Sequence, residues 1–195
     1  KPLSRPPVAE AEAAGRLLEL AYWTGAHLHM VHGTLPRTFD LIDWNRGKGV
    51  HATGETCLQY LLLTMEALRE QGGRMKCNPP LRAQEHVDGL WKQVQEGVVD
   101  IVTSDHSPYP LDRKLTRDIF DALAGMPGVE TLGTLLYSEG VATGRIDLKR
   151  LVQLVSSGPA EGFGFAGKGR FEPGADADFV VFDPDTMWRL DEAET

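Results

Sequence analysis

An alternation of helical and apolar segments over the first 105 residues most constrains the fold. Short apolar runs occupy residues 27–32, 50–53 and 98–103, and helix-like segments lie before and between them. Strands separated by helices favour a parallel sheet with right-handed crossovers. Each run ends in a polar or glycine-containing loop, which is typical of barrel strands whose carboxyl ends carry chemistry. We predict an α/β fold and favour a barrel. A doubly wound sheet is the alternative, although no glycine-rich phosphate loop follows any run.

Apolar periodicity predicts where the helices lie. Ala14, Leu17, Leu18 and Ala21 follow the i, i+3, i+4, i+7 spacing of a helix over 8–24. The same kind of pattern predicts helices over 36–46, 60–71, 84–96, 113–124, 129–142 and 146–157. Asp147 is the expected N-cap of the last of these.

The predicted secondary structure changes after residue 157, from helices to turns and a strand. Residues 158–170 are dense in glycine, and Phe179–Phe182 is a strand-like run. We therefore predict two parts: a partial barrel over 1–157, and a small β element over 158–195.

Composition narrows the partners and the compartment. The net charge is −8 and no basic cluster exists, which argues against nucleic acid or an anionic membrane as a partner. No apolar stretch is long enough to span a bilayer, and the start does not resemble a signal peptide. Two cysteines, Cys57 and Cys77, are too few for a disulfide scaffold. These features predict a cytoplasmic protein.

His32 and Asp105 are the candidate metal ligands. Each ends a predicted strand, so both point toward one rim of a barrel. Histidine and aspartate are ligand types for a divalent metal such as zinc, or for iron or manganese, but a catalytic zinc site has about three protein ligands. A histidine at a strand end is often only hydrogen-bonded, and an aspartate there is often a turn former. The residues alone leave the metal and the structural interpretations open.

Four motifs in order resemble the cyclic amidohydrolases, which comprise allantoinases, hydantoinases, dihydropyrimidinases and class I dihydroorotases. The motifs lie at 30–32, 54–61, 76–82 and 103–108. Residues 125–131 and 169–181 are similar to two further family segments. The resemblance implies the C-terminal half of a metal-dependent (β/α)8 TIM-type barrel, about strands six to eight, followed by part of a small β-sandwich. It also implies that this chain, which starts at Lys1 without methionine, is a piece of a longer protein.

The resemblance implies a binuclear centre of divalent metal, expected to be zinc. His32 matches the family's sixth-strand ligand and Asp105 its eighth-strand ligand. No residue matches the H-x-H pair, the carbamylated lysine or the fifth-strand histidine. A metal-bound hydroxide would open a cyclic amide, with Asp105 as the catalytic residue that moves the proton. Asn78 and Ala124 match substrate-binding positions, and the partners implied are a small cyclic amide and further copies of the protein.

The ring that is opened is less constrained by the residues. The segments 76–80 and 104–108 together are closer to those of allantoinases, which is the favoured activity, whereas 54–60 is closer to hydantoinases. Tyr109 stands where dihydroorotases usually have a histidine, which counts against that activity. The alternative of another class is a non-catalytic relative that keeps the barrel as a scaffold. These 195 residues alone should be inactive, because most ligands are missing.

Overall fold

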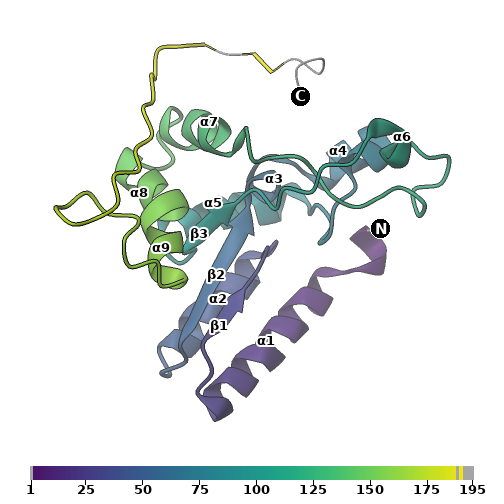
Figure 1. Ribbon diagram of the computed structural model, residues 1–195. Helices are drawn as coiled ribbons and strands as arrows, with labels where there is room; N and C mark the ends of the chain where they lie inside the picture. Colours follow the sequence, from purple (N-terminus) through teal and green to yellow (C-terminus); the bar gives the residue numbers. More distant parts are fainter. Residues whose placement is uncertain (1, 188, 191–195) are drawn as a thin grey trace.

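A three-stranded parallel sheet organises the computed structural model, which describes residues 2–187, 189 and 190. Its strands are β1 (Leu28–Met30), β2 (Ala52–Cys57) and β3 (Ile101–Thr103), in the order β1-β2-β3. Leu28 pairs with Ala52, and Glu55 pairs with Ile101. The predicted order of parallel strands separated by helices is therefore confirmed (Figure 1).

Short helices make up most of the remaining regular structure. The α-helices are α1 (Pro7–Thr24), α2 (Pro36–Arg46), α3 (Leu58–Leu62), α4 (Met65–Gln71), α5 (Gln84–Gln95), α6 (Leu111–Lys114), α7 (Leu132–Leu136), α8 (Leu148–Val152) and α9 (Gly158–Gly162). Two short 3-10 helices are η1 (Pro2–Ser4) and η2 (Gly72–Met75). Two short π-helices are η3 (Tyr137–Val141) and η4 (Gln153–Ser157). In the part of the chain that the structure describes, no helix has the length and apolar character needed to cross a bilayer.

The core lies where α1, α2 and α5 pack with one face of the sheet. Leu18, Phe39 and Ile42 are fully buried there. A Cβ on Gly54 would lie 2.6 Å from Ile42 Cδ1, so α2 packs directly on the backbone of β2. The neighbouring residues Thr53 and Glu55 are only partly buried, as the alternation along a strand requires. One face of the sheet is thus covered by helices and the other is more open.

The predicted helix over 60–71 is wrong in its continuity. Leu63 is extended, with φ −116° and ψ 142°, and it separates α3 from α4. The N–H of Met65 is bonded to the carbonyl of Arg82 at 2.7 Å instead of to a preceding turn. A contact distant in sequence therefore overrides the local helical pattern.

The predicted helix over 113–124 is also wrong for most of its length. Only Leu111–Lys114 is helical, and the chain then follows irregular turns. The ammonium of Lys76 takes the carbonyls of Ile119, Phe120 and Ala122, which a helix would have used internally. Further on, the predicted Asp147 cap is confirmed, because its carboxylate accepts the N–H of Arg150 at 2.7 Å.

The predicted strand at 179–182 is not assigned as a strand. Phe179, Val180 and Val181 are exposed, and the chain beyond α9 leads away from the sheet as an extended trace (Figure 1). A strand requires a hydrogen-bonded neighbour, and no ladder is formed there within residues 2–187. The predicted β element over 158–195 remains a prediction, and residues 188 and 191–195 of it lie outside the described residues.

Candidate functional site

The carboxyl edge of the sheet brings His32 and Asp105 to one side of the molecule. His32 lies two residues beyond β1 and Asp105 two residues beyond β3. The strands flank β2 in a parallel sheet, so their ends share an edge. Among the described residues, these two are the non-glycine positions with positive φ, 42° and 45°. Such backbone costs about 1 kcal/mol or more per residue, and it gathers at functional sites.

The loop after β1 is fixed to β2 beside His32. The N–H of Gly33 donates to the carbonyl of Glu55 at 2.8 Å, and the hydroxyl of Thr56 donates to the carbonyl of Gly33 at 2.7 Å. A Cβ on Gly33 would meet the ring of Phe39 at 3.0 Å. The backbone of β2 and the Phe39 side chain of α2 therefore fix the turn that carries His32.

Asp105 is exposed and lies within electrostatic range of the end of β2. Burial raises the pKa of the Cys57 thiol, and the charge of Asp105 raises it further. Burial likewise raises the pKa of Tyr60, with a smaller contribution from Asp105. Both groups are neutral at physiological pH, so neither is an activated nucleophile.

His106, next to Asp105, is bound to a different loop. Its Nδ1 accepts the backbone N–H of Gly128 at 3.1 Å and that of Val129 at 3.2 Å. Because Nδ1 accepts, the proton of the neutral ring resides on Nε2. His106 therefore anchors the strand end that carries Asp105, which agrees with a supporting role.

The segments that carry Asn78 and Ala124 lie side by side. The N–H of Gly125 donates to the carbonyl of Lys76 at 2.9 Å, and the ammonium of buried Lys114 donates to that same carbonyl at 2.9 Å. Lys114 also donates to the carbonyl of Gly125. Asn78 itself is exposed, and its Oδ1 accepts from Arg5 at 3.2 Å.

Sequence reasoning missed the two lysines that join these segments. Lys76 and Lys114 are 8% and 3% exposed, although lysine is seldom buried. The motif at 76–82 contains Lys76 and could have drawn attention to it. Lys114 lies in a stretch with helical periodicity, and no local pattern marks it as buried.

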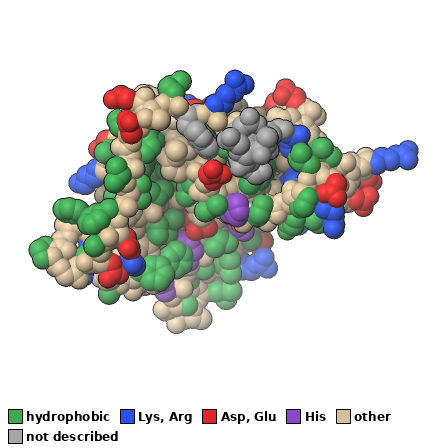
Figure 2. Space-filling model, turned by 45° about the horizontal axis from the view of Figure 1, so that its top comes forward, with side chains coloured by type: hydrophobic (Ala, Val, Ile, Leu, Met, Phe, Trp, Pro, Cys, Tyr) green, Lys and Arg blue, Asp and Glu red, His purple; other side chains and the backbone are tan. Residues whose placement is uncertain are grey.

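The donor types of His32 and Asp105 fit a divalent metal such as zinc, but their number is too small. A catalytic zinc site has about three protein ligands. Within residues 2–187, 189 and 190, no group of three or more His, Cys, Asp or Glu side chains is close enough to hold an ion. Figure 2 shows histidine side chains at the surface near the middle of one face, beside acidic ones. Among the described residues, His32 and Asp105 by themselves do not complete a site of this kind.

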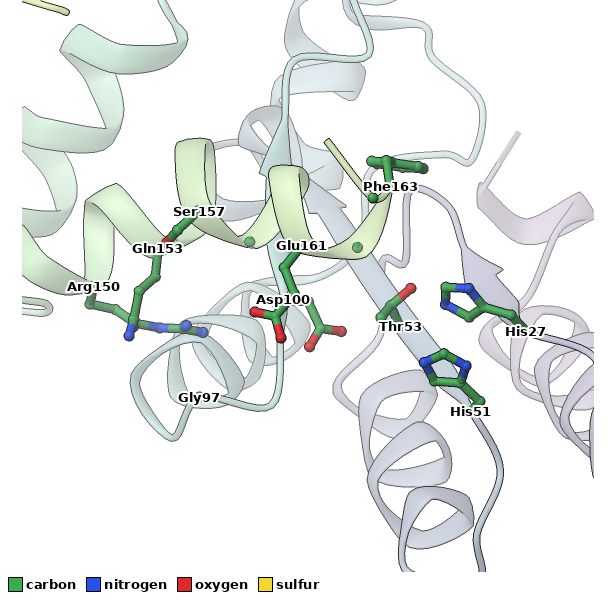
Figure 3. A pocket seen from close by; sticks show the side chains of 13 residues that line it. His27, His51, Thr53, Gly97, Asp100, Arg150, Gln153, Ser157, Glu161 and Phe163 are labelled. Carbon is green, nitrogen blue, oxygen red and sulfur yellow. The ribbon is translucent and has the colours of Figure 1, made fainter. Parts of the chain in front are cut away.

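A cavity of about 930 Å³ lies at the opposite, amino end of the strands (Figure 3). The rings of His27 and His51 stack at its wall with centroids 4.0 Å apart. Asp100, Arg150 and Glu161 also line it, whereas His32 and Asp105 do not. The cavity is therefore separate from the candidate catalytic edge.

Comparison with known proteins settles the family. The model of the Amidohydrolase family matches residues 17–194, which is most of the chain. The chain belongs to the amidohydrolase family.

Members of this family with curated names resemble the chain closely. An allantoinase from Rubrobacter xylanophilus is 46% identical over 181 residues, which are 93% of this chain and 40% of that protein. A D-hydantoinase from Rhizobium radiobacter is 38% identical and is matched over 98% of this chain and 43% of its own length. The chain thus spans about two fifths of these amidohydrolases.

Solved amidohydrolase structures share the fold. The L-hydantoinase (dihydropyrimidinase) from Arthrobacter aurescens superposes with a TM-score of 0.93 at 33% identity, covering 97% of this chain and 43% of that one. A D-hydantoinase crystal structure gives 0.90 at 36% identity, covering 99% and 43%. The predicted resemblance and the predicted class, part of a TIM-type α/β barrel, are confirmed.

Proposed function

We propose that the protein carrying this chain hydrolyses a C–N bond of a cyclic amide, with allantoin as the favoured substrate. The observation that carries the proposal is the placement of His32 and Asp105 at one edge of the sheet, each on a left-handed backbone. Two similar proteins are named allantoinase, at 46% and 36% identity. This chain would then form the C-terminal half of the catalytic barrel.

In this proposal His32 and Asp105 are two ligands of a binuclear metal centre, and the other ligands come from outside this chain. The metal, taken to be zinc, would supply water of lowered pKa and polarise the ring carbonyl. The Asp105 carboxylate accepts the proton of the attacking water. It then delivers that proton to the ring nitrogen as the C–N bond breaks, which regenerates the carboxylate.

Asn78 and Ala124 hold the ring in the proposed complex. Amide edges require paired donors and acceptors, which the Asn78 side chain and backbone groups near Ala124 provide. The contacts of Lys76 and Lys114 keep the two segments together. A preorganised cradle of this kind lowers the entropic cost of binding.

The assembly and compartment are part of the proposal. A homo-oligomer is proposed, and exposed aromatic side chains such as Trp23 and Trp44, 76% and 62% exposed, would be available for its contacts. Within the described residues neither Cys57 nor Cys77 forms a disulfide, which suits the reducing cytoplasm.

Hydantoinase or dihydropyrimidinase activity is the second candidate. It is supported by the 38% identity to a D-hydantoinase and by the superposition on the Arthrobacter aurescens structure. Tyr109, rather than a histidine, follows Pro108 and offers no positive charge to an acidic ring, which disfavours dihydroorotate. A non-catalytic scaffold is the candidate of another class.

A substrate panel tests the proposal. The whole protein that carries this chain, loaded with zinc, is assayed for opening of allantoin, hydantoin, a dihydropyrimidine and dihydroorotate. Faster turnover of allantoin is expected, and Asp105→Asn should abolish it. Preference for hydantoin or the dihydropyrimidine would select the second candidate. No turnover of any ring by a metal-loaded protein would refute the enzyme and favour the scaffold.

A further inference from the structure

A buried ion pair joins the start of the chain to the candidate site. Glu10 lies on α1 and Arg82 follows the segment of Asn78, and their side chains are 15% and 5% exposed. The Arg82 guanidinium donates to Glu10 Oε2 at 3.2 Å. Burying both charges is costly unless further hydrogen bonds satisfy them. The partners that supply those bonds indicate what the pair holds in place.

The carboxylate of Glu10 is bonded mainly to the loop after β1. It accepts the N–H of Thr34 at 2.8 Å, the hydroxyl of Thr34, and the hydroxyl of Thr38 at 2.8 Å. Thr34 is fully buried and lies two residues after His32. Glu10 thereby fixes the backbone that follows the candidate metal ligand.

The guanidinium of Arg82 connects this loop with the Asn78 segment. Its Nε donates to the hydroxyl of Thr34 at 2.8 Å, and NH1 donates to the carbonyl of Arg5 at 2.6 Å. The side chain of that same Arg5 donates to Asn78 Oδ1 at 3.2 Å. Three nitrogens of one planar group thus bind three different segments, an arrangement that a lysine ammonium does not reproduce.

We propose that Glu10, Thr34 and Arg82, here called the clamp, are positioning residues. They couple the orientation of His32 to the position of Asn78. The inference rests on the proposed function, because it assigns His32 to the metal and Asn78 to the substrate. One cluster then sets the relative placement of metal and ring. Loss of any member disturbs both at once, although none touches either.

The test uses the whole protein that carries this chain. Thr34→Val keeps the shape and removes the hydroxyl, whereas Thr34→Ser keeps the hydroxyl. Arg82→Lys keeps the charge and removes the fork. Glu12→Gln is the matched control, because the Glu12–Arg16 pair lies on the same helix with the same 3.2 Å separation but is exposed. The measurements are the zinc Kd by competition with a chromophoric chelator, and KM and kcat for allantoin and hydantoin.

Thr34→Val and Arg82→Lys should each weaken zinc binding and raise KM by about tenfold, the usual scale for groups that orient a metal ligand. Thr34→Ser and Glu12→Gln should stay within about twofold of the unchanged protein. A lower melting temperature with unchanged zinc Kd and KM would overturn the clamp as a positioning device. A variant that changes only the zinc Kd or only KM would overturn the proposed coupling between His32 and Asn78.

The clamp and the proposed function fail in different ways. If the unchanged protein opens no ring, the proposed function fails, and the zinc Kd of Thr34→Val against Thr34→Ser still decides whether the clamp orients His32. If Arg82→Lys does not fold, the two Thr34 variants decide. An active protein whose Thr34→Val variant matches Thr34→Ser in both measurements would leave the proposed function standing and reject the clamp.

Discussion

The Nδ1 atom of His106 accepts the backbone N–H of Gly128 at 3.1 Å and so ties two loops at the carboxyl edge of the sheet. The attachment continues one residue further along the chain, where the N–H of Ser107 donates to the carbonyl of Met126 at 2.8 Å. Asp105 directly precedes this attachment, and its backbone is left-handed. The loop at 126–129 therefore helps to hold the carboxylate at the rim.

Replacing His106 tests this attachment. Asparagine places an oxygen near the position of Nδ1 and can accept the same N–H groups, whereas leucine cannot. In the whole protein we expect His106→Leu to lower kcat by about tenfold, as for other groups that orient a ligand. His106→Asn should retain most of the activity. Equal kcat for the two variants, measured on allantoin, would contradict the role of the Nδ1 acceptor.

Asp105→Asn tests the proton-transfer role directly. An amide keeps the size of the side chain but cannot take and return a proton, so we expect kcat to fall by at least about a hundredfold. Asp112→Asn is the matched control, since Asp112 is an exposed aspartate on α6, seven residues further along the chain. Steady-state kinetics on allantoin give the comparison. Near-normal kcat in Asp105→Asn at full metal content would remove Asp105 from the catalytic role.

The regular part of the fold was predictable because each strand and helix is specified locally. The parallel order and the Asp147 cap follow from apolar periodicity and cap chemistry, which act over a few residues. The break at Leu63 and the irregular path after Lys114 depend instead on bonds to distant residues. Such contacts leave no local pattern, so helices were expected where the chain turns.

The residues of the candidate site likewise include some that local sequence patterns predict and some that they do not. His32 and Asp105 could be named because each follows an apolar strand with a residue type that binds metal. The buried position of Lys114 had no local signal, because lysine in a helical stretch is usually exposed. Arg82 belongs to the motif at 76–82, but nothing in that motif marks an arginine as buried. Their roles emerge only once residues far apart in sequence are brought together.

Burial of Lys114 predicts a pH dependence of stability. Burial lowers the pKa of this ammonium from its ordinary value of 10.5. Between the folded pKa and 10.5 the unfolded chain binds more protons, so this residue makes the unfolding free energy rise with pH. The contribution is lost as pH falls through the folded pKa.

Lys114→Met removes that titration and should flatten the rise in the window below 10.5. The slope due to one group is at most about 1.4 kcal/mol per pH unit. Urea unfolding of both proteins at several pH values measures it, and Lys92→Met, at an exposed lysine, serves as control. The unfolding free energy itself also falls in the variant. The test therefore compares how steeply the unfolding free energy changes with pH, and not its value at one pH. Parallel slopes in the unchanged and Lys114→Met proteins would contradict the prediction.

The isolated chain of 195 residues should not turn over any cyclic amide. Within the described residues, His32 and Asp105 have no third side chain of a ligand type close enough to complete a metal site. The outer edges of β1 and β3 are also unpaired there, so nothing in the described sheet closes the barrel around a ring. The chain and its Asp105→Asn variant, each with added zinc, should therefore open allantoin at the same background rate. Asp105-dependent turnover above that background would show that this part of the barrel builds a working site, alone or with a second copy.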